Sequence, residues 1–192
     1  MFLQTDKISF RPIEQSDLSI LRDWRNDPEL RARTRGFRPL NMLDQEKWWE
    51  GLRDSNNIMF LIQVPEIIEG LEEPVLEFIG VCGLTHIDWK NRSAELSWYI
   101  GDKDDRGKGL ARHIIYLLCE YAFTEIGLHR FWGEVYLIDD KIGPMYQHLG
   151  FRLDGCALET YWWNGKWWPS AYISIMDWMW EGMREKYLVK TA

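Results

Sequence analysis

Two glycines and two cations directly precede a long apolar segment in the stretch 104–123, DDRGKGLARHIIYLLCEYAF. Gly107 and Gly109 disfavour a helix, because glycine is a poor helix former. Where a strand leads into a helix, however, successive backbone N–H groups can converge on an anion, and the helix dipole adds partial positive charge. Arg106 and Lys108 add full charges beside them. The stretch therefore predicts a phosphate-binding loop.

The spacing of this loop fits two common phosphate motifs poorly. A nucleotide triphosphate loop needs G-x-x-x-x-G-K-[ST], but Gly101 lies one residue too far from Gly107, and Gly109 stands where the hydroxyl should be. A dinucleotide fingerprint needs a third glycine where Arg112 stands, and no early parallel strand–helix–strand unit begins the chain. An ordinary strand–helix turn, with glycine at its tightest points, is the alternative to a phosphate site.

Three elements in one order resemble the GNAT superfamily of N-acetyltransferases. The family's acetyl-CoA loop, Q/R-x-x-G-x-G/A, falls on residues 104–109, with Asp104 in place of the usual Gln or Arg. MYQHLGF, residues 145–151, resembles the family's L-Y-E-K-L-G-F element. NRSAELSWYIGD resembles the preceding strand in the branch with ribosomal-protein alanine, spermidine and amino-sugar N-acetyltransferases. The resemblance extends from about Ile8 to Trp178.

The resemblance implies that acetyl-CoA is the cosubstrate. Its pyrophosphate is expected on the loop and the helix start, at Arg106, Gly107, Lys108, Gly109, Leu110 and Ala111. Main-chain groups of Trp98, Tyr99 and Ile100 are expected to pair with the pantetheine arm like an added strand and to polarise the thioester. Asp139 stands where relatives carry asparagine, so it can accept a hydrogen bond from a pantetheine amide but cannot donate one.

Two side chains match the family's catalytic positions. Tyr146 stands where the family's tyrosine points at the thioester sulfur and can act as general acid, with packing beside Phe151 as the alternative. Glu95 stands on the strand where relatives often carry a glutamate that deprotonates the amine, directly or through water. The alternatives are that Glu95 is a surface carboxylate paired with Arg92 or Arg112, or that a water chain to backbone carbonyls acts as the base.

Basic and aromatic segments are candidates for contact with the acceptor amine. RARTRGFR, residues 31–38, holds four arginines around a phenylalanine. Arg35, Phe37 and Arg38 are candidates for binding an anionic part of the substrate, such as a nucleotide on an amino sugar or an acidic protein segment. The alternative is a solvated loop that offsets the carboxylates nearby. Trp162 is a candidate for the opposite wall of the acceptor site.

The twelve tryptophans stand out, and six of them fall between Trp162 and Trp180. Because large aromatic rings bury well, most of them are expected in the core. A substrate wall or a subunit interface is the alternative, and the tryptophan-rich C-terminal part is compatible with a homodimer.

The hydrophobic patterning predicts a mixed sheet flanked by helices, of the α/β or α+β class. The order is strand, two helices, a strand meander, then strand–helix–strand–helix–hairpin, which predicts a mostly antiparallel sheet with one parallel pair. Asn164-Gly165 is typical of the tight hairpin turn, and Asp44 is expected to cap the second helix. Pro144 suits a first helical turn, so the helix that carries Tyr146 is expected to begin there. The resemblance adds a GNAT-like fold whose central sheet splays at the cofactor site.

We expect one domain over residues 1–192, with a core from about 8 to 178 and a C-terminal helix to about 188. The formal net charge of −7 argues against nucleic acid as a partner, since a polyanion would be repelled. No apolar run reaches the ~20 residues that a bilayer span needs, and the N-terminus lacks a signal-peptide pattern, so we expect a cytoplasmic protein without a membrane partner. The three cysteines and four histidines lack ligand spacing, so no metal is expected.

The leading hypothesis is an N-acetyltransferase that transfers acetyl from acetyl-CoA to the primary amine of a small molecule, such as an amino sugar or a polyamine. A protein N-terminus, as in the ribosomal-protein branch, is the alternative acceptor. A non-catalytic module that binds acetyl-CoA is the alternative class, motivated by Asp104 and Asp139.

Overall fold

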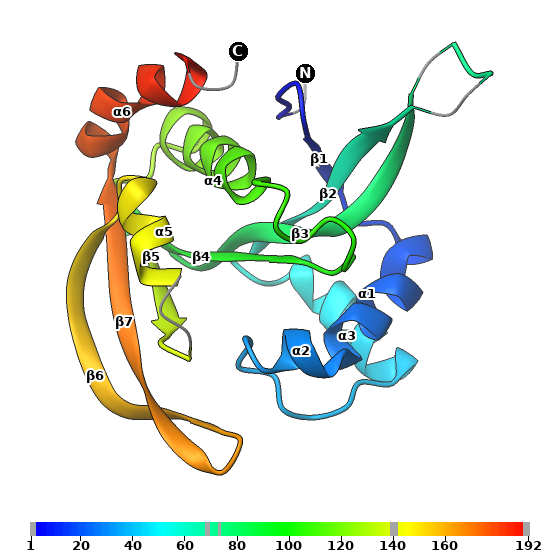
Figure 1. Cartoon of the computed structure of the whole chain (residues 1–192), viewed down its shortest axis with the longest axis horizontal. Helices are drawn as coiled ribbons and strands as arrows, with labels where there is room; N and C mark the ends of the chain where they lie inside the picture. Colours follow the sequence, from blue (N-terminus) through cyan, green and yellow to red (C-terminus); the bar gives the residue numbers. More distant parts are fainter. Residues whose placement is uncertain (1–2, 68–69, 73, 139–141, 190–192) are drawn as a thin grey trace. The chain divides into compact units, whose positions relative to one another are not determined.

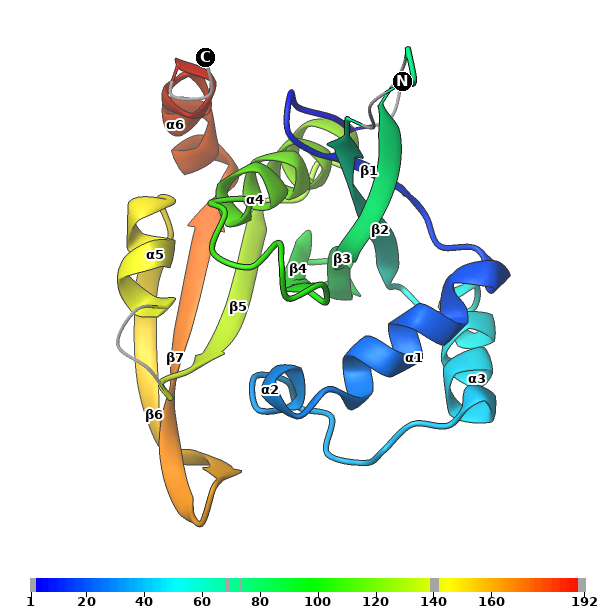
Figure 2. The same cartoon turned by 45° about the vertical axis from the view of Figure 1, so that its right-hand side comes forward.

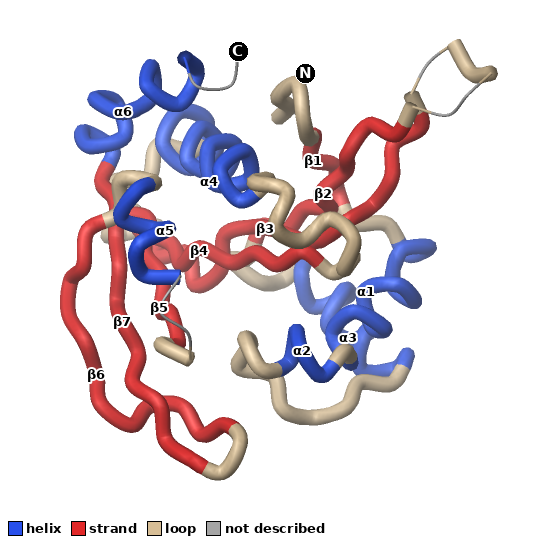
Figure 3. Tube along the Cα trace, viewed as in Figure 1, coloured by secondary structure: helices blue, strands red, loops and turns tan. Residues whose placement is uncertain are grey.

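The structure is a computed structural model that describes residues 3–67, 70–72, 74–138 and 142–189. Its strands and helices are coloured along the chain in Figure 1 and by type in Figure 3. They are β1 (Ser9–Pro12), η1 (Gln15–Asp17), α1 (Leu18–Asn26), α2 (Pro28–Arg31), α3 (Met42–Leu52), β2 (Ile58–Glu66), β3 (Val75–Asp88), β4 (Ser93–Ile100), α4 (Ala111–Cys119), η2 (Glu120–Glu125), β5 (Arg130–Tyr136), α5 (Ile142–His148), β6 (Arg152–Trp163), β7 (Lys166–Met176) and α6 (Asp177–Val189).

The strands hydrogen-bond in the order β1-β2-β3-β4-β5-β7-β6. The pairs β1–β2, β2–β3, β5–β7 and β6–β7 are antiparallel. Strands β4 and β5 are parallel over a short register, from Ser93↔Arg130 to Glu95↔Trp132. The predicted mostly antiparallel sheet with one parallel pair is confirmed. Beyond Glu95 the parallel register stops although β4 continues to Ile100, which is the point where the strands were expected to splay.

The chain divides into two compact units that share β3 and β4. The first unit comprises Met1–Thr85 and Ser97–Leu118. Part of its core is a cluster of five buried side chains, against which Trp24, Trp49 and Tyr99 pack. The cluster consists of Ile13, Leu18, Leu21, Leu61 and Val81. Helices α1 and α3 lie side by side in Figures 1 and 2.

The helix starts in the first unit follow their capping residues. Asp27-Pro28 separates α1 from α2, and the Asp27 carboxylate accepts hydrogen bonds from the N–H groups of Glu29 and Leu30. Helix α3 is capped by Asn41 rather than by the expected Asp44. Asp44 is the third helical residue, and its carboxylate accepts a hydrogen bond from the Asn41 N–H in a reciprocal capping box.

The second unit comprises His86–Leu96 and Cys119–Ala192. Strands β6 and β7 form a long hairpin whose turn holds Asn164 at φ +50° and Gly165 at φ +77°. Positive φ at both central residues is the geometry for which Asn-Gly is preferred, so the predicted turn is confirmed. Helix α5 begins at Ile142 among the described residues, which is two positions before the predicted start at Pro144. Proline is tolerated there because the first-turn N–H groups have no helical acceptor.

The expectation that most tryptophans enrich the core is wrong. All twelve lie within the described ranges, and only Trp180 is buried. Trp162 and Trp167 are each more than half exposed, at 55% and 53%, and form a cross-strand pair next to the hairpin turn. Their ring centroids lie 5.2 Å apart at an interplanar angle of 61°. Such aromatic pairs stabilise a hairpin directly, without burial in a core.

Candidate functional site

The predicted phosphate loop connects β4 to α4 in the first unit (Figure 3). Gly107 has a φ of +80° and Gly109 a φ of +79°, a region that other residues rarely adopt. Residues 107–109 are exposed, and a Cβ built on either glycine would meet no atom within 4 Å. The first bond of α4 runs from the Ile114 N–H to the Leu110 carbonyl at 3.0 Å. The N–H groups before Ile114 therefore have no acceptor within the helix, as an anion site requires, and the loop fits a phosphate.

The Arg106 side chain ties this loop to the end of β4. Its Nε donates to the Ile100 carbonyl and its Nη2 to the Gly101 carbonyl, both at 3.0 Å. Its Nη1 also donates to the Glu29 carboxylate at 3.0 Å. In this structure Arg106 therefore positions the loop, and backbone N–H groups are the principal donors that remain for a phosphate.

The second cation of the loop is also paired. Lys108 donates to the Asp105 carboxylate at 2.8 Å, although 57% of the Lys108 side chain is exposed. The Asp105 side chain is only 9% exposed, so Lys108 neutralises a buried carboxylate in this structure. Asp104 is exposed, and its own N–H donates to Asp102.

The end of β4, where the pantetheine arm was expected, packs closely on β3. A Cβ at Gly80 would collide with the Tyr99 carbonyl, and the N–H groups of Gly101 and Asp102 both donate to the Ile79 carbonyl. The Tyr99 side chain packs on the core of the first unit. Burial raises the pKa of its phenol, with the nearby Arg25 charge acting in the opposite direction. Tyr99 therefore offers only its main chain to a ligand.

Glu95 in the second unit is buried, with 5% of the residue exposed, and its Oε2 lies 2.8 Å from Nδ1 of His86. The alternative of a surface carboxylate is therefore wrong. His86 is exposed and has a φ of +50°, which is unusual for a residue other than glycine. Strained backbone of this kind is often found at functional sites. The pair joins a buried carboxylate to an imidazole in contact with solvent.

Tyr146, on α5 of the second unit, is 8% exposed. Its ring packs edge-on against Phe151 at a centroid distance of 5.3 Å. The Tyr146 carbonyl accepts a hydrogen bond from the Phe151 N–H at 3.0 Å, which closes the turn after α5. Packing beside Phe151 and a catalytic hydroxyl are compatible, because the contact uses the ring and the backbone only.

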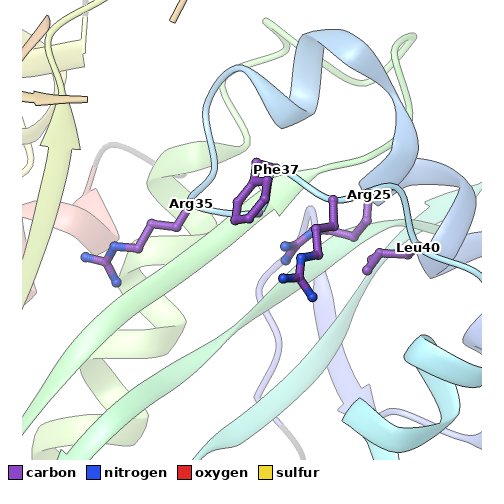
Figure 4. A pocket seen from close by; sticks show the side chains of 6 residues that line it. Arg25, Arg35, Phe37 and Leu40 are labelled. Carbon is purple, nitrogen blue, oxygen red and sulfur yellow. The ribbon is translucent and has the colours of Figure 1, made fainter. Parts of the chain in front are cut away.

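The acceptor candidates fall in different units. Arg35, Phe37 and Arg38 line one pocket in the first unit, together with Arg25, Gly36 and Leu40 (Figure 4). Trp162 lies on the β6–β7 hairpin of the second unit. Asp139, the predicted pantetheine contact, lies outside the described residues.

Two residues of these sites were missed by the sequence analysis. The sequence offers one signal for His86, the short interval between a strand that ends at Asp88 and the next strand, which begins at Ser93, but only the strand register in the structure sets His86 against Glu95. Asp88 closes that turn by accepting hydrogen bonds from Asn91. Arg25 carries no such signal, since it lies on α1 and reaches the pocket only through the fold.

Neither a cluster of metal ligands nor a membrane-length apolar helix occurs in the described part of the chain. No group of three or more histidine, cysteine, aspartate or glutamate side chains there is arranged to hold a metal ion. No helix within the same ranges is both long and apolar enough to cross a membrane.

Comparisons with known proteins agree with this geometry. The family model described as acetyltransferase (GNAT) domain matches residues 7–152. Spermidine N(1)-acetyltransferase from Vibrio cholerae is 25% identical over 162 residues, which cover 83% of this chain and 87% of that protein. A putative ribosomal N-acetyltransferase from Bacillus subtilis is 30% identical over 118 residues, which cover 60% of this chain and 64% of the relative.

A solved structure has a similar fold. The crystal structure of the Vibrio cholerae spermidine N-acetyltransferase in complex with CoA and spermine superposes with a TM-score of 0.79 at 22% identity. The match covers 96% of this chain and 99% of that structure. Another structure of the spermidine enzyme from that organism is dodecameric and matches with a TM-score of 0.74 at 22% identity, over 90% of this chain and 95% of that one.

Proposed function

Because the chain belongs to the GNAT acetyltransferase family, we propose that it transfers the acetyl group of acetyl-CoA to the primary amine of a small molecule. The observation that supports acetyl-CoA as the cosubstrate is the pair of positive-φ glycines, Gly107 and Gly109, directly before α4. A polyamine is the first candidate acceptor, since a spermidine acetyltransferase matches more than four-fifths of the chain. A protein N-terminus is the second candidate, favoured by the likeness to a putative ribosomal N-acetyltransferase.

In this proposal acetyl-CoA supplies an activated acetyl thioester, and the chain positions it. Backbone N–H groups of residues 107–111 hold the pyrophosphate, and Arg106 sets the angle between the loop and β4 through its bonds to the Ile100 and Gly101 carbonyls. Main-chain groups of residues 98–100 align the pantetheine arm. Such positioning replaces a bimolecular encounter by an oriented one and accounts for much of the rate.

Glu95 and His86 take the proton from the acceptor amine and pass it toward solvent. An alkylamine with a pKa near ~10 is mostly protonated at neutral pH and must lose a proton before it attacks. Glu95 accepts that proton, directly or through water, and the 2.8 Å contact with Nδ1 of His86 continues the path to solvent. Tyr146 donates a proton to the departing thiolate, so its hydroxyl acts as general acid.

An assay of free thiol release with a panel of polyamines, amino sugars and peptides tests this function. We expect turnover with at least one small amine and a loss of about 10²-fold or more in kcat for Tyr146→Phe, with CoA binding retained. Tyr121→Phe is the matched control, since it removes a phenol hydroxyl from the same unit. CoA binding without turnover for any amine or peptide would favour the non-catalytic module instead.

Assembly, location and domain organisation are part of the same proposal. The dodecameric neighbour makes a larger homo-oligomer a candidate assembly, and light scattering coupled to size-exclusion chromatography would distinguish it from a homodimer. A single domain, a cytoplasmic location and the absence of a nucleic-acid partner remain predictions from the sequence.

A further inference from the structure

The pocket around Phe37 concentrates positive charge. Three of its six lining residues are Arg25, Arg35 and Arg38, and Figure 4 shows the Phe37 ring between the side chains of Arg25 and Arg35. The Arg38 guanidinium carbon lies 5.6 Å from the centroid of the Phe37 ring, and Phe37 is 74% exposed. The chain carries a net charge of −7, so this cluster does not reflect a basic composition.

The pocket wall is held in place by hydrogen bonds. The Asn26 side-chain amide donates to the Leu40 carbonyl and accepts from the Leu40 N–H, both at 2.8 Å. The Arg31 side chain donates to the Phe37 carbonyl. A Cβ at Gly36 would lie 2.6 Å from Nη2 of Arg25, so the glycine lets the wall approach this guanidinium. A wall ordered in advance reduces the entropy lost when a ligand binds.

The nearest carboxylates in sequence are paired elsewhere. Asp27 lies 2.9 Å from Lys103, and Glu29 lies 3.0 Å from Arg106. Within the ranges that the structure describes, neither Arg25 nor Arg38 forms a salt bridge with a carboxylate. For Arg25 and Arg38, the alternative that the arginines merely offset carboxylates nearby is therefore poorly supported. The guanidinium groups of Arg25 and Arg38 line the same pocket and repel one another, and an anion between them would remove that repulsion.

We propose that this pocket binds the oxyanion group, phosphate or carboxylate, of a small molecule that also stacks a flat ring on Phe37. Guanidinium groups match the geometry of such oxyanions through two parallel hydrogen bonds. A polycation such as a polyamine would be repelled by the same groups, so a polyamine acceptor would have to bind elsewhere. The site is inferred independently of the proposed acetyl transfer.

Calorimetric titration with phenyl phosphate and with inorganic phosphate tests the site, in the presence of saturating CoA to occupy the glycine loop. Arg35 and Arg38 are both exposed, so the Arg35→Gln/Arg38→Gln double variant is expected to fold. It should bind both anions at least about tenfold more weakly than the unmodified protein. Phe37→Ala should weaken phenyl phosphate alone, about tenfold. Arg33→Gln, in the same segment but outside the pocket lining, is the matched control and should change neither affinity.

The outcome of this titration tests the anion site independently of acetyl transfer. Equal phosphate affinity in the unmodified protein and the double variant would overturn the proposal, whether or not acetyl transfer is observed. If the site is confirmed, inhibition kinetics identify the source of its anion. Inhibition by phenyl phosphate that is competitive with the amine indicates that the acceptor itself carries the oxyanion. Inhibition or activation that is not competitive indicates a separate anionic effector.

Discussion

Replacing Gly107 with alanine tests the phosphate loop through its backbone. An alanine forced to keep the φ of +80° costs roughly 1–2 kcal/mol, because its Cβ crowds the following carbonyl in the left-handed region. A Cβ at this position meets no protein atom within 4 Å, so no collision inside the protein adds to the penalty. The expected total penalty is therefore the conformational strain alone.

This strain appears in one of two measurements. If the free loop already has this conformation, the free energy of unfolding in urea falls by about 1–2 kcal/mol and CoA affinity is unchanged. If the free loop relaxes, the same energy appears as roughly 5- to 30-fold weaker CoA binding in calorimetry. The two losses are expected to sum to about 1–2 kcal/mol in either case.

Gly182→Ala is the matched control for Gly107→Ala. Gly182 is exposed within α6 and lacks a positive φ, so alanine should stabilise that helix by about 0.5–1 kcal/mol without changing CoA affinity. If Gly107→Ala altered neither stability nor CoA affinity, the conformational argument would be refuted. A loss of CoA affinity far beyond about 30-fold would contradict strain as the whole cause and indicate that the Cβ takes space needed by the phosphate.

Four other substitutions probe charge, proton transfer and the pH dependence of stability. Asp104→Gln should bind CoA about two- to fivefold more tightly in calorimetry, because it removes an exposed negative charge beside the phosphate loop; weaker binding would contradict this. The Glu95→Gln variant should have a kcat lower by about 10²-fold or more. The His86→Asn variant should have a kcat lower by about tenfold and unchanged stability, because asparagine tolerates positive φ. Full activity in both variants would exclude the proton path. Burial raises the pKa of the Asp17 carboxyl, but the Arg11 side chain and the Glu14 N–H outweigh it and lower the pKa overall. Asp17 therefore contributes stability above its unfolded pKa of about 3.9, and this stability is lost as the pH falls through the lower folded pKa. The Asp17→Asn variant should lose roughly 2–3 kcal/mol of unfolding free energy at pH 7. In urea unfolding measured across pH, its stability should also fall less steeply on the acid side than that of the unmodified protein.

Elements whose conformation depends on neighbouring residues could be predicted from the sequence. Asn164-Gly165 adopts its two positive φ values, and Asp27-Pro28 separates α1 from α2. The burial of the tryptophans could not be predicted in this way. The hydrophobicity of Trp162 does not indicate whether another element covers the strand on which it lies.

The sequence by itself determined the strand–glycine loop–helix order, since φ preferences act over a few neighbouring residues, and its resemblance to the GNAT family gave the candidate chemistry of Tyr146. Only the tertiary structure placed His86 against the buried Glu95, turned Arg106 toward the β4 carbonyls and brought Arg25 to the pocket of Phe37. Such contacts join side chains that are distant along the chain, and they depend on strand register and helix packing. A pattern of neighbouring residues does not by itself determine strand register or helix packing.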